Sequence, residues 1–126
     1  MSKGEIPAEV RRFILTSIPS VPFLEAVLLL RAEPAHDWEA AQLARRLYVG
    51  ERTGAELLDL LVASGVGSRL EGARGARYAP QQELRALIDG LAEAYAADLV
   101  AVTDLIHSRI DKRAQQFADA FRFRKE

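Results

Sequence analysis

The sequence predicts a mostly helical protein with one small β-hairpin. Apolar residues recur at helical spacing over most of the chain. Three of the eight glycines fall within residues 66–79, where the weak alternation of apolar and polar residues is typical of short strands. With 126 residues, 49% hydrophobic and 28% charged, the chain has the size and composition of one globular domain.

Two helices are predicted before residue 34. The first, over residues 8–18, carries an apolar stripe at helical spacing formed by Val10, Phe13, Ile14 and Ile18. Pro19 then interrupts the chain. The second helix is expected to start near Pro22, since proline is well tolerated in a first turn, and to stop before Pro34. Its apolar residues cover most of its circumference, which predicts a helix buried on several sides.

Two more helices are predicted between residues 37 and 65. Asp37 is a candidate N-cap for a helix that runs to residue 49 and stops at Gly50. Thr53 and Glu56 have the spacing of a capping box immediately before an apolar run. They predict that a fourth helix opens at Thr53, and Gly65 is expected to end it.

The rest of the chain is predicted to form the hairpin and one long helix. Residues 66–70 and 76–79 are expected to pair around a turn from Gly72 to Gly75. From Gln81 onward there is no proline, and apolar residues recur with a period near 11, which keeps them on one face of a nearly straight helix. Such a helix either breaks, with residues 108–113 as the expected place, or is covered by a second chain.

This order of elements resembles the winged helix-turn-helix domain of bacterial regulators of the MarR and PadR type. The residues that carry the resemblance are WEAAQLARRL and the segment LLDLLVASGV that leads into SRLEGARGARYA. It covers residues 22–80, with an N-terminal helix in residues 1–21 and a long C-terminal helix in residues 81–126. The resemblance is one of fold, because winged helices also serve as protein-interaction modules.

The resemblance implies a dimeric transcriptional regulator that binds double-stranded DNA. The helix opening at Thr53 would be the recognition helix, with Arg52 and Thr53 facing bases. Arginines of the hairpin would contact the DNA backbone, and two arginines of the preceding helix would add phosphate contacts. The expected DNA-binding residues are therefore Arg45, Arg46, Arg52, Thr53, Arg69, Arg74 and Arg77.

The charge pattern supports an alternative, a winged-helix protein–protein interaction module or adaptor. Glu51, Glu56 and Asp59 lie where phosphates would approach, and residues 37–79 hold six acidic residues against six arginines. The net charge of the chain is −1, whereas DNA-binding domains are commonly basic. The alternative would use this acidic helix together with the phenylalanine-rich basic tail.

The apolar stripe of the long helix predicts a homodimer. The residues expected at the dimer or partner interface are Leu91, Tyr95, Leu99, Val102, Ile106, Ile110, Phe117 and Phe121. Residues 107–126 hold six basic and three acidic residues, whereas residues 80–106 hold one arginine and five acidic residues. This asymmetry favours antiparallel pairing, and a protein partner or nucleic acid at the basic tail is the alternative.

The residues present favour no enzymatic function. The chain has no cysteine, no phosphate-binding glycine loop and no nucleophile motif, so we expect no catalytic residue and no cofactor. Asp104, His107 and Asp111 share a helical face but have no partner motif, and we expect no metal. Trp38, Tyr48, Tyr78 and Tyr95 are candidates to line a crevice. The longest apolar run, residues 26–30, predicts a cytoplasmic protein without a membrane span.

Overall fold

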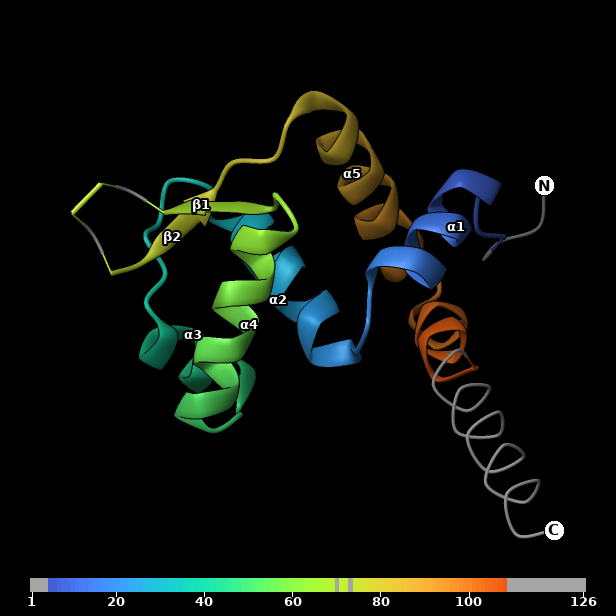
Figure 1. The fold of residues 1–126 in the computed structure, drawn as a ribbon. Helices are drawn as coiled ribbons and strands as arrows, with labels where there is room; N and C mark the ends of the chain where they lie inside the picture. The colour runs from blue at the N-terminus through green and yellow to red at the C-terminus, as the bar shows by residue number, and fades with distance from the viewer. Residues whose placement is uncertain (1–4, 70, 73, 109–126) are drawn as a thin grey trace, which may run out of the picture.

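The computed structural model describes residues 5–69, 71–72 and 74–108. They form a mostly helical protein with a small antiparallel hairpin, as the sequence predicts (Figure 1). The elements are α1 (Ala8–Ser17), α2 (Val21–Ala32), α3 (Ala40–Leu47), α4 (Glu51–Ala63), β1 (Gly67–Arg69), β2 (Ala76–Tyr78), α5 (Gln82–Ala97) and a further helix, Leu99–Ser108. In the hairpin, Gly67 pairs with Tyr78 and Arg69 with Ala76.

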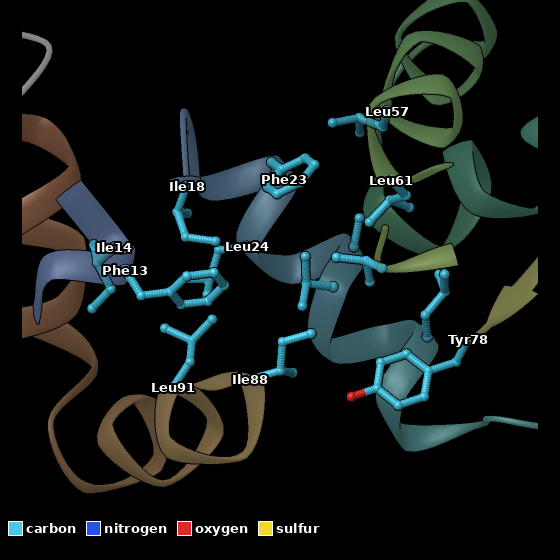
Figure 2. Packing of buried hydrophobic residues seen from close by; sticks show 14 of the residues in the cluster. Phe13, Ile14, Ile18, Phe23, Leu24, Leu57, Leu61, Tyr78, Ile88 and Leu91 are labelled. Atoms are coloured by element: carbon cyan, nitrogen blue, oxygen red, sulfur yellow. The ribbon is translucent and has the colours of Figure 1, made fainter. Parts of the chain in front are cut away.

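Helix α2 lies at the centre of the molecule. It contacts α3, α4, α5 and β2, and Figure 1 shows α3, α4 and the hairpin on one side of it, with α1 and α5 on the other. Leu24, Val27 and Leu30 of α2 are fully buried. Figure 2 shows side chains from α1, α4, β2 and α5 gathered around α2, and they form one core. The predicted burial of this helix on several sides is therefore confirmed.

The start of α3 differs from the prediction. Asp37 is not the N-cap, because the next residue pairs with the hairpin: the Trp38 N–H donates to the Ala76 carbonyl at 2.8 Å, and the Ala76 N–H donates to the Trp38 carbonyl at 2.9 Å. This bridge keeps the chain extended through Glu39, which becomes the N-cap and forms a capping box with Gln42. Gly75 permits the close approach, since a Cβ there would lie 2.7 Å from the Trp38 carbonyl oxygen.

The turn between α3 and α4 also differs. Tyr48, not Gly50, adopts the left-handed conformation that ends α3, with a φ of 58°. Gly50 is instead the N-cap of α4, and the Gly54 N–H already donates to its carbonyl at 2.9 Å. Helix α4 thus starts at Glu51, before Thr53. The predicted capping box fails because Thr53 lies inside the first helical turn.

The predicted long C-terminal helix is interrupted at Asp98. This residue has a non-helical backbone, with a φ of −154° and a ψ of 84°, and it ends α5. Its carboxylate accepts a hydrogen bond from the Ala101 N–H at 3.0 Å, as an N-cap of the next helix does. The break therefore comes ten residues before the expected 108–113 region. Its cause is a cap residue and not a proline or glycine.

We expect replacement of Asp98 by alanine to lower the free energy of unfolding by about 1 kcal/mol, the usual cost of losing an N-cap side chain. The Ala101 N–H then lacks its acceptor. Urea denaturation of the variant measures the change. Asp104→Ala is the matched control, because Asp104 is an exposed acid in the same helix. Equal stabilities of the two variants would contradict the capping role.

Candidate interaction surface

Helices α3 and α4 cross in direct contact, and this crossing fixes the surface that α4 presents. A Cβ at Gly54 would lie 2.6 Å from the Ala40 carbonyl oxygen and 2.7 Å from the Ala44 Cβ, so only glycine fits at the crossing. The apolar residues Leu57, Leu58 and Leu61 point into the core. The exposed side of α4, which we call the α4 face, consists of Glu51, Arg52, Thr53, Glu56, Asp59 and Leu60.

The arginines of the hairpin are held by carboxylates of the same domain. The Arg77 Nε donates to the Asp37 carboxylate at 2.9 Å. Arg69 forms an ion pair with Asp59 of α4 and also donates to the Arg74 carbonyl at 3.2 Å. Among the residues that the structure describes, the Arg74 guanidinium has no ion-pair partner. The predicted arginine-bearing wing therefore has one guanidinium that is not already engaged.

The arginines of α3 and α4 that were expected to bind DNA also fall into two groups, those with an ion pair and those without one. Arg46 pairs with Glu33 at 3.3 Å and lies 5.5 Å from the centre of the Trp38 ring. Arg52 pairs with Glu56, one turn along α4, at 3.5 Å. Arg45 is exposed and has no ion pair within the described part of the chain. Four of the six arginines expected to bind DNA are thus neutralised internally.

These ion pairs affect how the surface would meet a charged ligand more than they affect the free energy of unfolding. Exposed ion pairs contribute at most about 1 kcal/mol each, so a strong ligand can displace them. Moving Arg52 or Arg69 to a phosphate, however, would leave the released carboxylate beside that same phosphate. Glu51 adds a further negative charge at the start of α4. The α4 face and the hairpin together are close to neutral, and this surface is poorly suited to a polyanion.

Tyr48 is the most exposed of the large hydrophobic residues that the structure describes. Its exposed fraction is 95%, and it lies in the turn between α3 and α4. A left-handed backbone conformation is uncommon for residues other than glycine and asparagine, and it costs a tyrosine about 1–2 kcal/mol. The prediction that Tyr48 lines a crevice is wrong, because the turn directs it into solvent.

Three of the five described residues that were predicted to form a dimer are interior. Leu91, Val102 and Ile106 are fully buried within one chain, and Val102 and Ile106 lie beyond the break at Asp98, where the stripe packs on the same core. Tyr95 is partly buried, and Leu99 is 51% exposed. Ile110, Phe117, Phe121 and the rest of the basic tail lie outside the described residues. The homodimer therefore stays a prediction that rests on Leu99 and the tail.

The other aromatic residues of the predicted crevice belong to the core. Tyr78 is buried against α2 and α5 (Figure 2), and burial raises the pKa of its hydroxyl while the nearby Arg85 opposes this shift. A cavity of about 310 Å³ does lie between α1, the start of α2, α5 and the residues that follow α4. Its lining is apolar apart from two serines and contains none of the four predicted aromatic residues; it consists of Phe13, Ser17, Phe23, Ser64, Val66 and Leu84.

The described residues contain no group of three or more histidine, aspartate or glutamate side chains placed to hold a metal. No single described helix is long and apolar enough to cross a membrane; α1 and α2 would be so only together, and they are bent by 116° at their junction.

Comparisons with protein-family models, curated proteins and solved structures gave no match to this chain.

Proposed function

We propose that this protein is a protein–protein interaction module whose partner docks on the α4 face and Tyr48. The observation that carries the proposal is the combination of a near-neutral surface with a fully exposed tyrosine. Glu51, Glu56 and Asp59 face outward where a DNA-binding domain would need positive charge. Interfaces between proteins tolerate such neutral, mixed surfaces and are enriched in tyrosine.

The conformation of Tyr48 supports a binding role for its side chain. Glycine at this position would relieve the backbone strain, and the exposed ring contributes almost nothing to the core. Tyrosine at position 48 therefore lowers the stability of the fold without a gain in core packing. Residues that bind other molecules often show such a cost to stability. Tyrosine is also among the residues that most often dominate binding energy at interfaces.

The surface around Tyr48 indicates the chemistry of the partner. The carboxylate of Glu51, which has no ion pair with any residue that the structure describes, lies at the start of α4, three residues beyond Tyr48. At the far end of the α4 face, Leu60 is 46% exposed. A complementary protein would offer an apolar socket for the tyrosine ring, with lysine or arginine beside it to meet the carboxylates. The proposed partner is therefore a protein with a basic-rimmed apolar pocket.

Replacement of Tyr48 by glycine should change stability and binding in opposite directions. We expect the free energy of unfolding to rise by about 1 kcal/mol, because glycine adopts φ of 58° without strain. Binding to the partner should fall at least about tenfold, as for a central aromatic residue at an interface. Thermal unfolding measures the first effect, and titration calorimetry with the purified partner measures the second.

The partner is first identified by comparing the proteins that bind to the immobilised wild type, Tyr48→Phe and Tyr48→Gly. Tyr48→Phe is the matched control. A protein bound by the wild type and by Tyr48→Phe, but not by Tyr48→Gly, meets the expectation because the ring is what both binders share. A captured set that is the same for all three proteins would exclude Tyr48 as an anchor and would remove the main support for the proposal.

A DNA-binding transcriptional regulator is the second candidate, and the unpaired guanidinium groups of Arg45 and Arg74 favour it. Both lie on elements that a winged helix brings near DNA. The test is selection from a random duplex pool at about 100 mM salt, where phosphate contacts stay strong. A two-fold-symmetric enriched site, lost when Arg45 and Arg74 are replaced by glutamate, would establish this function in place of the first.

A further inference from the structure

A polar cleft lies beside α3, and its lining includes neither Tyr48 nor any residue of the α4 face. Its volume is about 220 Å³, and it is formed by the end of α2, the loop that follows and α3. It is lined by Glu33, His36, Trp38, Gln42, Arg45 and Arg46. A cleft of this size accommodates a carboxylate or phosphate group with a few ordered waters.

The walls of the cleft are held in place by contacts within the domain. Trp38 is fixed by its backbone bridge to β2 and is almost fully buried. The His36 ring meets it edge-on with the ring centres 4.3 Å apart, and its Nε2 lies 3.3 Å from the Gln42 Oε1. Arg46 lies over the same indole. The aromatic wall, His36 and Arg46 are thus positioned before a ligand arrives, and only Arg45 has to be ordered on binding.

The charge of the cleft is positive. Arg45 and Arg46 contribute two guanidinium groups against the single carboxylate of Glu33, which Arg46 already holds at 3.3 Å. Arg45 has no ion-pair partner among the described residues, so its donors are free to bind. Guanidinium groups form short, charge-assisted hydrogen bonds to carboxylates and phosphates, often two at once.

We propose that this cleft is an anion-binding site, in which Arg45 is the principal ligand-binding residue. The anion is a carboxylate or a phosphate, and Arg46 and His36 complete the site. The inference is independent of the proposed partner protein, because small anions alone test it. Arg45 was expected from the sequence to contact DNA phosphates, whereas here it belongs to a concave site with an aromatic wall.

The fluorescence of Trp38 reports on binding, since Trp38 is the only tryptophan in the chain and it lines the cleft. The full-length protein is titrated with inorganic phosphate and, separately, with a capped Asp-Asp dipeptide, while sodium chloride is adjusted to keep the ionic strength constant. We expect a saturable change in tryptophan emission. Arg45→Gln should weaken binding about tenfold, as loss of a hydrogen bond to a charged group predicts.

Arg12→Gln is the matched control, because it removes an exposed arginine of α1 that lies outside the cleft. It should bind the anions as the wild type does. A phosphate response shared with a short DNA duplex would identify nucleic acid as the source of the anion, and a response to the dipeptide alone would identify acidic protein segments. No saturable response to any probe, or equal weakening by Arg45→Gln and Arg12→Gln, would overturn the proposal. Unchanged thermal unfolding of Arg45→Gln verifies that the fold is retained.

Discussion

Replacement of Gly54 by alanine is expected to lower the free energy of unfolding by about 2 kcal/mol, although alanine is the better helix former by about 1 kcal/mol. The added Cβ would lie 2.6 Å from the Ala40 carbonyl oxygen and 2.7 Å from the Ala44 Cβ. Both neighbours are held by α3, so neither can move without separating the two helices. Because α3 and α4 form the candidate interaction surface, we also expect weaker partner binding.

Thr53→Ala is the control for this result. Thr53 is the neighbouring residue in the same helix turn, and it is exposed. Alanine there should leave stability unchanged or raise it by a few tenths of a kcal/mol, through helix propensity alone (about 0.5 kcal/mol at most). Chemical denaturation of both variants makes the comparison. A Gly54→Ala protein as stable as the wild type would mean that α3 and α4 do not cross in contact.

Replacement of Ile106 by alanine is expected to cost about 3 kcal/mol of stability at every protein concentration. Ile106 is 1% exposed and belongs to the same core as Leu91 and Val102. Its removal leaves a cavity inside one chain. If it lay instead at a dimer interface, the midpoint of unfolding would shift with protein concentration. Thermal unfolding at two concentrations a hundredfold apart distinguishes the two cases.

Leu99→Ala is the variant, matched to Ile106→Ala, that tests the predicted dimer. Leu99 belongs to the same apolar stripe but is 51% exposed in one chain. We expect its loss to change the unfolding free energy by less than about 1 kcal/mol. Sedimentation velocity then shows whether the protein self-associates through this face. A large destabilisation by Leu99→Ala, together with a small one by Ile106→Ala, would refute the fold-back of the C-terminal helix.

The helices and the hairpin could be predicted because each has a local signal. The stripe of Val10, Phe13 and Ile14 marks α1, and the glycines at 67, 72 and 75 mark the hairpin. The helix starts were predicted less well. Asp37 and Thr53 are good caps by residue type, yet neither begins a helix, since a cap also requires a non-helical backbone at its own position and helical backbone directly after it.

The candidate site, like the fold, was predicted only where a local sequence signal exists. Residue type and spacing identified the three acids of α4 and the arginines, and the structure places Arg52 and Arg69 beside those acids but Arg45 and Arg46 in a separate cleft. The pairings of Arg69 with Asp59, of Arg77 with Asp37 and of Arg46 with Glu33 join residues 10 to 40 positions apart. No local pattern encodes such contacts. The cleft beside Trp38 was missed for the same reason, although the spacing of His36, Gln42 and Arg45 is visible in the sequence.

The sequence alone determined which segments are helical, where the hairpin turns and which residues are apolar enough to form a core, because these depend on side-chain periodicity and on glycine and proline. Tertiary structure decided three further features. The bridge between Trp38 and Ala76 moved the start of α3, packing of Val102 and Ile106 on the core placed the C-terminal stripe inside after the break at Asp98, and ion pairs such as that of Arg69 with Asp59 engaged arginines expected to bind DNA. Each depends on contacts between groups distant in sequence that only the packed chain brings within van der Waals, hydrogen-bonding or Coulombic range.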